Sequence, residues 1–132
     1  MRKLFYVLLV CALGLCNTSC IYEEHTDYAI DWSFSVVSCN DLDEFSQLSN
    51  AFYDAFDAEF ATVGEFVGGE HNRCLRDSDL DKASSIAAEH AKAAAAKLNF
   101  PEDIRNHYAA KVEVSSADRE KQAVVWSQEY GM

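Results

Sequence analysis

Basic residues are missing from a long stretch of this sequence. Between Cys20 and Glu70 there are twelve aspartates and glutamates but no lysine or arginine. Over the whole chain, 22 acidic residues outnumber 11 basic ones, and the formal net charge is −11. An acidic surface repels the phosphates of DNA and RNA, so this imbalance argues against a nucleic-acid partner. It suits a basic protein partner, and equally a charge that only keeps the protein soluble.

The sequence also lacks the familiar catalytic motifs. It has no nucleophile elbow, no HExxH motif and no phosphate-binding glycine loop, and its cysteines form no CxxC pair. No repeat or low-complexity tract is present. A catalytic triad can still assemble from residues far apart in the chain. We nevertheless expect a non-catalytic protein without a cofactor, and we assign no catalytic residue.

Two short stretches resemble fragments of metal sites. In DSDLDK, residues 77–82, three aspartates alternate like the first ligands of a calcium loop, but Lys82 stands where that loop needs glycine. We interpret this stretch as the acidic start of a helix, where aspartates offset the helix dipole. His71 and Cys74, in HNRC, would supply only half of a structural zinc site. No metal site is predicted.

The first residues have the layout of a targeting segment. Arg2 and Lys3 precede an uncharged, mostly apolar run at 4–16, and a polar patch follows at 17–19. This order is typical of a secretory signal peptide, and the apolar run is too short to span a bilayer comfortably. We predict that residues 1–19 form a signal peptide.

The junction at Cys20 resembles that of a bacterial lipoprotein precursor. In that class a small residue precedes the cysteine that receives the lipid, as Ser19 precedes Cys20, although Asn17 departs from the usual apolar residue. Cys16 fits less well because the bulky Leu15 precedes it. The resemblance implies cleavage before Cys20, lipid attachment to Cys20 and a membrane anchor.

Two further features bear on where such a protein would reside. Glu23 and Glu24 resemble the acidic signal that directs some lipoproteins of Gram-negative bacteria to the cell surface. The resemblance therefore implies an exported, lipid-anchored protein of the outer membrane, on its periplasmic or cell-surface side. The alternative is ordinary signal-peptidase cleavage near residue 20, which would release a soluble product.

Two cysteines, Cys39 and Cys74, remain after the proposed lipidation site. In an oxidising compartment they can form a disulfide, and the long loop it closes would stabilise the fold by about 3–4 kcal/mol. We predict this disulfide. Two unpaired, buried thiols are the alternative, since spacing in the sequence does not measure a distance between Cα atoms.

Hydrophobic periodicity predicts one α+β domain at residues 28–132, after a lipidated tether at 20–27. Alternation predicts strands near 28–36, 108–114 and 124–130, and three- or four-residue spacing predicts helices at 41–63 and from about 78 to 99, with a loop at 64–77. Asp41 and Glu44 form a capping-box-like start, and Glu59 falls near the apolar stripe of the first helix. The order β-α-α-β-β predicts a three-stranded antiparallel sheet with both helices packed on one face.

The polar side of the first predicted helix is our candidate binding surface. It carries Asp43, Asp54 and Asp57, with no lysine or arginine nearby in the sequence to pair with them. A solvated helix surface is the alternative interpretation. We expect an inhibitor-like or immunity-like protein that binds a basic partner through these carboxylates. The competing hypothesis is a structural subunit of an outer-membrane assembly, held by apolar contacts.

Overall fold

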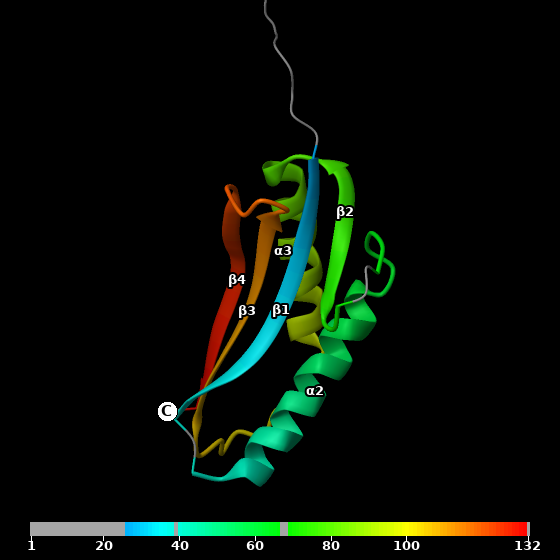
Figure 1. Ribbon diagram of the computed structural model, residues 1–132. Helices are drawn as coiled ribbons and strands as arrows, with labels where there is room; N and C mark the ends of the chain where they lie inside the picture. The colour runs from blue at the N-terminus through cyan, green and yellow to red at the C-terminus, as the bar shows by residue number, and fades with distance from the viewer. Residues whose placement is uncertain (1–25, 39, 67–68, 132) are drawn as a thin grey trace, which may run out of the picture.

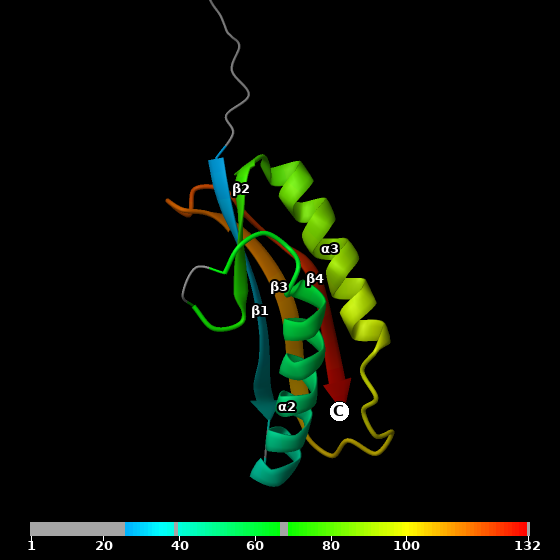
Figure 2. The ribbon, with the colours of Figure 1, turned by 90° about the vertical axis from the view of Figure 1, so that its right-hand side faces the viewer.

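The structure, a computed structural model, describes residues 26–38, 40–66 and 69–131. Within these ranges six elements alternate along the chain (Figure 1). They are β1 (Thr26–Ser38), α2 (Leu42–Phe60), β2 (Asn72–Ser78), α3 (Leu80–Ala96), β3 (His107–Ser116) and β4 (Gln122–Gly131). The strands form an antiparallel sheet in the order β2-β1-β3-β4, and both helices cover one face of it (Figure 2). The α+β class and the two-layer arrangement are confirmed.

The prediction of a three-stranded sheet is wrong, because β2 forms within the stretch expected to be a loop. β2 pairs with β1 from Asp31 opposite Asn72 to Thr26 opposite Ser78. Its sequence NRCLRDS has only two apolar residues and no alternation, since this edge strand leaves most of its side chains partly or fully exposed. Its pairing is specified by the backbone of β1. Periodicity therefore could not reveal it.

A glycine allows the chain to approach β2 after α2 ends. Gly64 has φ +60°, and Glu65 exchanges two backbone hydrogen bonds with Cys74, of 2.9 and 2.8 Å. A Cβ atom at Gly64 would lie 2.2 Å from the Cys74 carbonyl oxygen. Only glycine tolerates both the left-handed backbone and this close approach.

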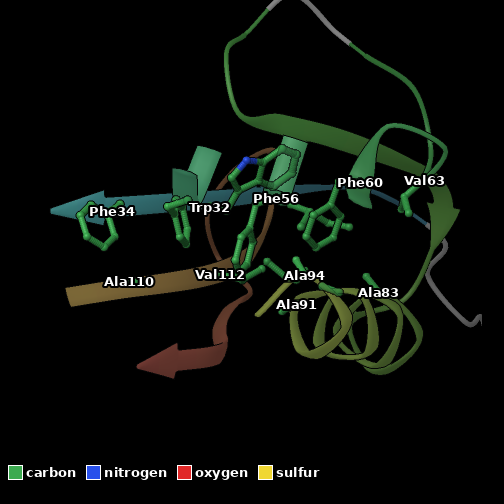
Figure 3. Close-up of a cluster of buried hydrophobic side chains, with 14 of the residues drawn as sticks. Trp32, Phe34, Phe56, Phe60, Val63, Ala83, Ala91, Ala94, Ala110 and Val112 are labelled. Atoms are coloured by element: carbon green, nitrogen blue, oxygen red, sulfur yellow. The ribbon is translucent and has the colours of Figure 1, made fainter. Parts of the chain in front are cut away.

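The core lies between the sheet and the two helices. The inward side of β1 supplies Tyr28, Ile30, Trp32 and Phe34, and α2 adds the fully buried Phe52, Phe56 and Phe60. The inner face of α3 consists of the buried Ala83, Ala87, Ala91 and Ala94, which leave room for the large rings opposite (Figure 3). Trp32 stacks on Phe60 with ring centroids 4.5 Å apart. Burying each phenylalanine contributes about 1.5–3 kcal/mol.

The ends of the predicted apolar stripes lie outside this core. Val36 on β1 is 41% exposed and Leu42, the first residue of α2, is 74% exposed. Both positions fit the hydrophobic periodicity of the sequence, but the facing layer of the fold does not extend over them. The outer residues of the stripes therefore remain on the surface.

The start of α2 has the predicted cap at Asp41. Asp41 is the N-cap and accepts hydrogen bonds from the backbone of residues 43 and 44, as expected. Glu44 accepts hydrogen bonds from Arg105 N (2.9 Å), Asn106 Nδ2 (2.8 Å) and the Tyr108 hydroxyl (2.9 Å). These contacts attach α2 to the segment that leads into β3. The hydrogen bond from the Arg105 backbone, first among these contacts, lowers the pKa of Glu44.

A second carboxylate connects the two helices. Glu59 of α2 lies 2.8 Å from His90 Nδ1 and accepts a hydrogen bond of 2.9 Å from the Lys97 ammonium, at the C-terminal cap of α3. Its side chain is only 15% exposed. The Lys97 contact, followed by that of His90, lowers the pKa of Glu59. Its unusual place near the apolar stripe is thereby explained.

Candidate functional site

Two of the three predicted binding carboxylates lie on the exposed surface of α2. Asp43 and Asp54 are both exposed, and eleven residues bring the helix back to nearly the same angular position three turns later, about 16 Å along its axis. Within the described ranges neither side chain forms an ion pair. Asp43 also lies in the first helical turn, where a negative charge is favourable.

Asp57, the third predicted carboxylate, is engaged with side chains from two other elements. Its Oδ1 accepts a hydrogen bond of 2.7 Å from the Trp32 indole nitrogen. His71 Nδ1 lies 3.0 Å from both carboxylate oxygens of Asp57. The partner of Asp57 is thus a histidine distant in sequence, and not a lysine or an arginine.

His71 is held in place through its backbone and its ring. Its φ of 60° is uncommon for a residue with a side chain, and its carbonyl oxygen accepts a hydrogen bond of 3.2 Å from Trp32 N. Its ring stacks on Tyr53 at a centroid distance of 3.9 Å. The Tyr53 hydroxyl accepts a hydrogen bond of 3.1 Å from Phe34 N. Phe34 lies on β1, past Asp31, the last residue that pairs with β2. α2 therefore covers the edge of β1 that β2 leaves unpaired.

These side chains form one wall of a cavity of about 320 Å³ that we call the His71 pocket. It is lined by Trp32, Asp57, Ala61, Phe66, Gly69, Glu70, His71, Asn72 and Arg73. The pocket lies between the C-terminal part of α2 and the chain that enters β2. Phe66, on its rim, is 61% exposed, which is high for so large an apolar side chain.

The polar groups that line the His71 pocket differ in whether they have hydrogen-bond partners. Arg73 directs two of its five N–H donors at the backbone, since Nε donates to the Val63 carbonyl (2.7 Å) and Nη2 to the Gly64 carbonyl (2.9 Å). Asn72 Oδ1 is buried and has no hydrogen-bond partner among the described residues. Buried acceptors without a donor are rare and costly.

The pocket contains an acid–base pair. Asp57 and His71 resemble the acid–base part of a catalytic triad, and among the described residues that line the pocket there is no serine, threonine or cysteine. Across the described ranges, no group of three or more histidine, cysteine, aspartate or glutamate residues is placed to hold a metal ion. The helix interpretation of DSDLDK holds for two of its aspartates, since Asp79 is the N-cap of α3 and accepts from Lys82 N, and Asp81 lies in the first turn. Asp77 lies in β2 instead.

Of the cysteines with a predicted role, only Cys74 lies among the described residues. Cys20 and Cys39 lie outside the described residues, and Cys74 carries a free, partly buried thiol whose pKa is raised by burial and by the Asp27 carboxylate. Cys74 pairs with Ala29 in the sheet. The Cys39–Cys74 disulfide stays a prediction.

The sequence indicated the carboxylates of this region but not the pocket. Tyr53 and Asp57 are spaced one helical turn apart, which is a weak signal that both face one neighbour. Nothing in the spacing indicates that the neighbour is His71. His71 and Cys74 of the HNRC stretch do not meet at one site, because His71 contacts α2 whereas Cys74 pairs with Ala29 in the sheet.

Comparisons with models of protein families, with curated proteins and with solved structures found no match to this chain. Neither described helix is both long enough and apolar enough to cross a membrane.

Proposed function

We propose that this chain is an exported lipoprotein, anchored through Cys20, whose domain binds a basic protein partner without catalysing a reaction. An inhibitor-like or immunity-like protein is the most specific form of this proposal. The observation that carries it is the pair Asp43 and Asp54, two exposed carboxylates aligned on α2 with no ion-pair partner in the described part of the chain. Unpaired like charges are tolerated more easily where a cationic partner compensates them.

The orientation of the domain suits this role. The described chain begins at Thr26, at one end of β1, and the first turn of α2 with Asp43 lies at the opposite end of the molecule (Figure 1). A strand of 13 residues is about 43 Å long. A lipid on Cys20 would therefore leave the Asp43 end of α2 facing away from the membrane, where a partner can reach it.

The proposal is tested by capturing the partner from native membranes with Asp43→Asn/Asp54→Asn. We expect capture to weaken about tenfold, since two partly screened charge pairs contribute about 1–2 kcal/mol together. Wild-type capture should also fall as salt rises from 0.1 to 1 M, over which the Debye length shrinks from about 10 to about 3 Å.

The control is Glu89→Gln/Glu120→Gln, which removes two exposed negative charges, one on α3 and one in the turn between β3 and β4. It should leave capture unchanged. Equal capture by wild type and by the Asp43/Asp54 variant would refute binding through this face.

The second candidate, a structural subunit of an outer-membrane assembly, is favoured by a separate observation. Val36 and Val37 of β1 and Leu42 of α2 are exposed by 41, 55 and 74% at the same end of the molecule. Apolar side chains gathered at one end suit a constitutive interface. Salt-resistant capture that is lost in Val37→Ser/Leu42→Ser would support this function in place of the first.

A further inference from the structure

β2 contributes little to the hydrophobic core. Among the described residues, the buried apolar core includes no side chain of β2, and only Leu75 packs partly against it. β4, at the other edge of the sheet, is held by aromatic rings instead. The ring centroids of Trp126 and Phe56 lie 5.3 Å apart, and those of Tyr130 and Phe100 lie 4.9 Å apart. The two edge strands therefore differ in how firmly their side chains attach them to the domain.

Several contacts of β2 join it to the turn that precedes it and not to the sheet. Glu65 exchanges two backbone hydrogen bonds with Cys74. Arg73 donates to the carbonyl oxygens of Val63 and Gly64. These contacts can persist when β2 leaves β1, because residues 63–65 and β2 belong to one segment of the chain.

Two carboxylates hold the ends of β2 against the rest of the domain. At one end Asp57 lies 3.0 Å from His71, the residue before β2. At the other end Asp27 accepts hydrogen bonds from Asp77 N (3.1 Å) and from the Arg76 guanidinium (3.3 Å). The side chains of Asp57 and Asp27 are 45 and 47% exposed. Ion pairs in contact with solvent contribute little to stability, so both ends are weakly held.

The backbone is left-handed at both ends of β2. His71 has φ 60° and Asp77 has φ 57°, a conformation that is unfavourable for residues with a Cβ atom. The stacking of His71 on Tyr53, and the hydrogen bond from Trp32 N to its carbonyl oxygen, hold this backbone in place. Detachment of β2 would release both residues from the unfavourable conformation.

We propose that β2 is a strap that detaches from β1 while the rest of the domain stays folded. β1 keeps its pairing with β3, which extends from Tyr28 to Ser38, and its buried side chains remain in the core. Opening uncovers the edge of β1 at residues 26–31, where β2 pairs. An uncovered strand edge is open to pairing with another strand, and the strap controls access to it. This opening does not require the proposed partner of α2.

Amide hydrogen exchange of the purified, ¹⁵N-labelled protein tests the strap within a single strand. Successive residues of an antiparallel strand direct their backbone groups to alternate neighbours. Trp32 N donates to the His71 carbonyl on the β2 side. Ile30, two residues earlier, therefore also faces β2, whereas Ala29 and Asp31 face β3.

We expect the amides of Ile30 and Trp32 to exchange about 100-fold faster than those of Ala29 and Asp31. The reason is that a local opening costs less free energy than unfolding of the whole domain. Equal exchange at the four positions would show that β2 leaves only when the domain unfolds, and would refute the strap.

The opposite edge of the sheet is an internal control. Ser116 N donates to the Lys121 carbonyl, so the amides of Val112 and Val114, on the same side of β3, face β4. They should exchange as slowly as the amide of Asp31. Exchange as fast as at Ile30 would show that any edge strand opens equally, which would overturn the special role of β2.

Asp27→Ala separates opening of the strap from loss of global stability. It removes the half-exposed carboxylate at one end of β2. Exchange at Ile30 should become about fivefold faster, with Val114 unchanged. Glu89→Gln removes an exposed carboxylate of α3 and should leave both rates at their wild-type values. Equal acceleration at Ile30 and Val114 in Asp27→Ala would mean that the whole domain is destabilised, and would contradict the strap.

Discussion

The carboxylates of α2 differ mainly in whether they contact hydrogen-bond donors from other parts of the chain. Asp43 and Asp54 are exposed, whereas Glu44, Asp57 and Glu59 contact β3, His71 and α3 respectively. Glu44 is the most connected, with donors from three residues converging on its two oxygens. A residue so placed fixes the entry into β3 and has little freedom to bind a partner.

The Tyr108 hydroxyl tests how much this network contributes. Tyr108 is fully buried and donates to Glu44 at 2.9 Å, so Tyr108→Phe should lower the free energy of unfolding by about 1–2 kcal/mol. Tyr130, opposite Tyr108 in the sheet, has no hydroxyl hydrogen bond within the described ranges. Tyr130→Phe should change stability by less than about 0.5 kcal/mol in the same urea titration. Equal losses in the two variants would contradict the role of Glu44.

Among the elements, α2 makes contacts of several kinds. Its phenylalanines fill the core, its Tyr53 caps the free edge of β1, and its Asp57 orients His71. Its Glu59 reaches the last turn of α3, where the Lys97 ammonium also interacts well with the helix dipole. α2 therefore determines both the packing of the domain and the shape of the His71 pocket.

The contact between the helices predicts a dependence on pH. The Lys97 contact lowers the pKa of Glu59 in the folded protein below its ordinary value of 4.5. The stabilisation is therefore full above that value and is lost as pH falls through it toward the folded pKa. Glu59→Gln should lower the urea midpoint at pH 7, and the difference from wild type should shrink between about pH 5 and pH 3.

The control for this titration is Glu89→Gln, which lies on the exposed face of α3. Its urea midpoint should follow that of wild type at every pH. A difference between Glu59→Gln and wild type that stays constant down to pH 3 would show that the charge of Glu59 does not matter.

For the whole molecule, the proposed anchor and the proposed binding surfaces lie at different places. β1 runs the length of the sheet, from the end nearest Cys20 in the sequence to the end where α2 begins (Figure 1). The His71 pocket lies toward the other end of α2, beside the start of β2. The proposed partner surface, Asp43 with Asp54 along α2, is thus separate from the pocket at the C-terminal end of the helix.

The anchor is tested by the intact mass of the protein purified from its native membranes. We expect a chain that begins at Cys20 and carries acyl groups, because several chains at about 0.8 kcal/mol per buried CH₂ hold a protein firmly on a membrane. Cys20→Ala should leave the membrane fraction. Cleavage at another bond, or an unmodified Cys20, would refute the anchor.

Much of the fold was predictable because its periodicity is local. The alternation in β1 and the three- and four-residue spacing in α2 predicted the buried faces correctly from Tyr28 to Phe34 and from Leu48 to Phe60. β2 was missed because an edge strand with exposed side chains has no periodic signal. Its existence depends on the free edge of β1, which is a property of the assembled sheet.

The sequence by itself determined the acidic charge, the main helices and strands, and the resemblance to a lipoprotein precursor at Cys20, since each is written in neighbouring residues. Only the tertiary structure decided which carboxylates find partners. Asp57 meets His71 and Trp32, and Glu44 meets Tyr108, across separations of 14, 25 and 64 residues. Spacing along the chain carries no information about these long-range contacts, because they depend on how the helices pack against the sheet.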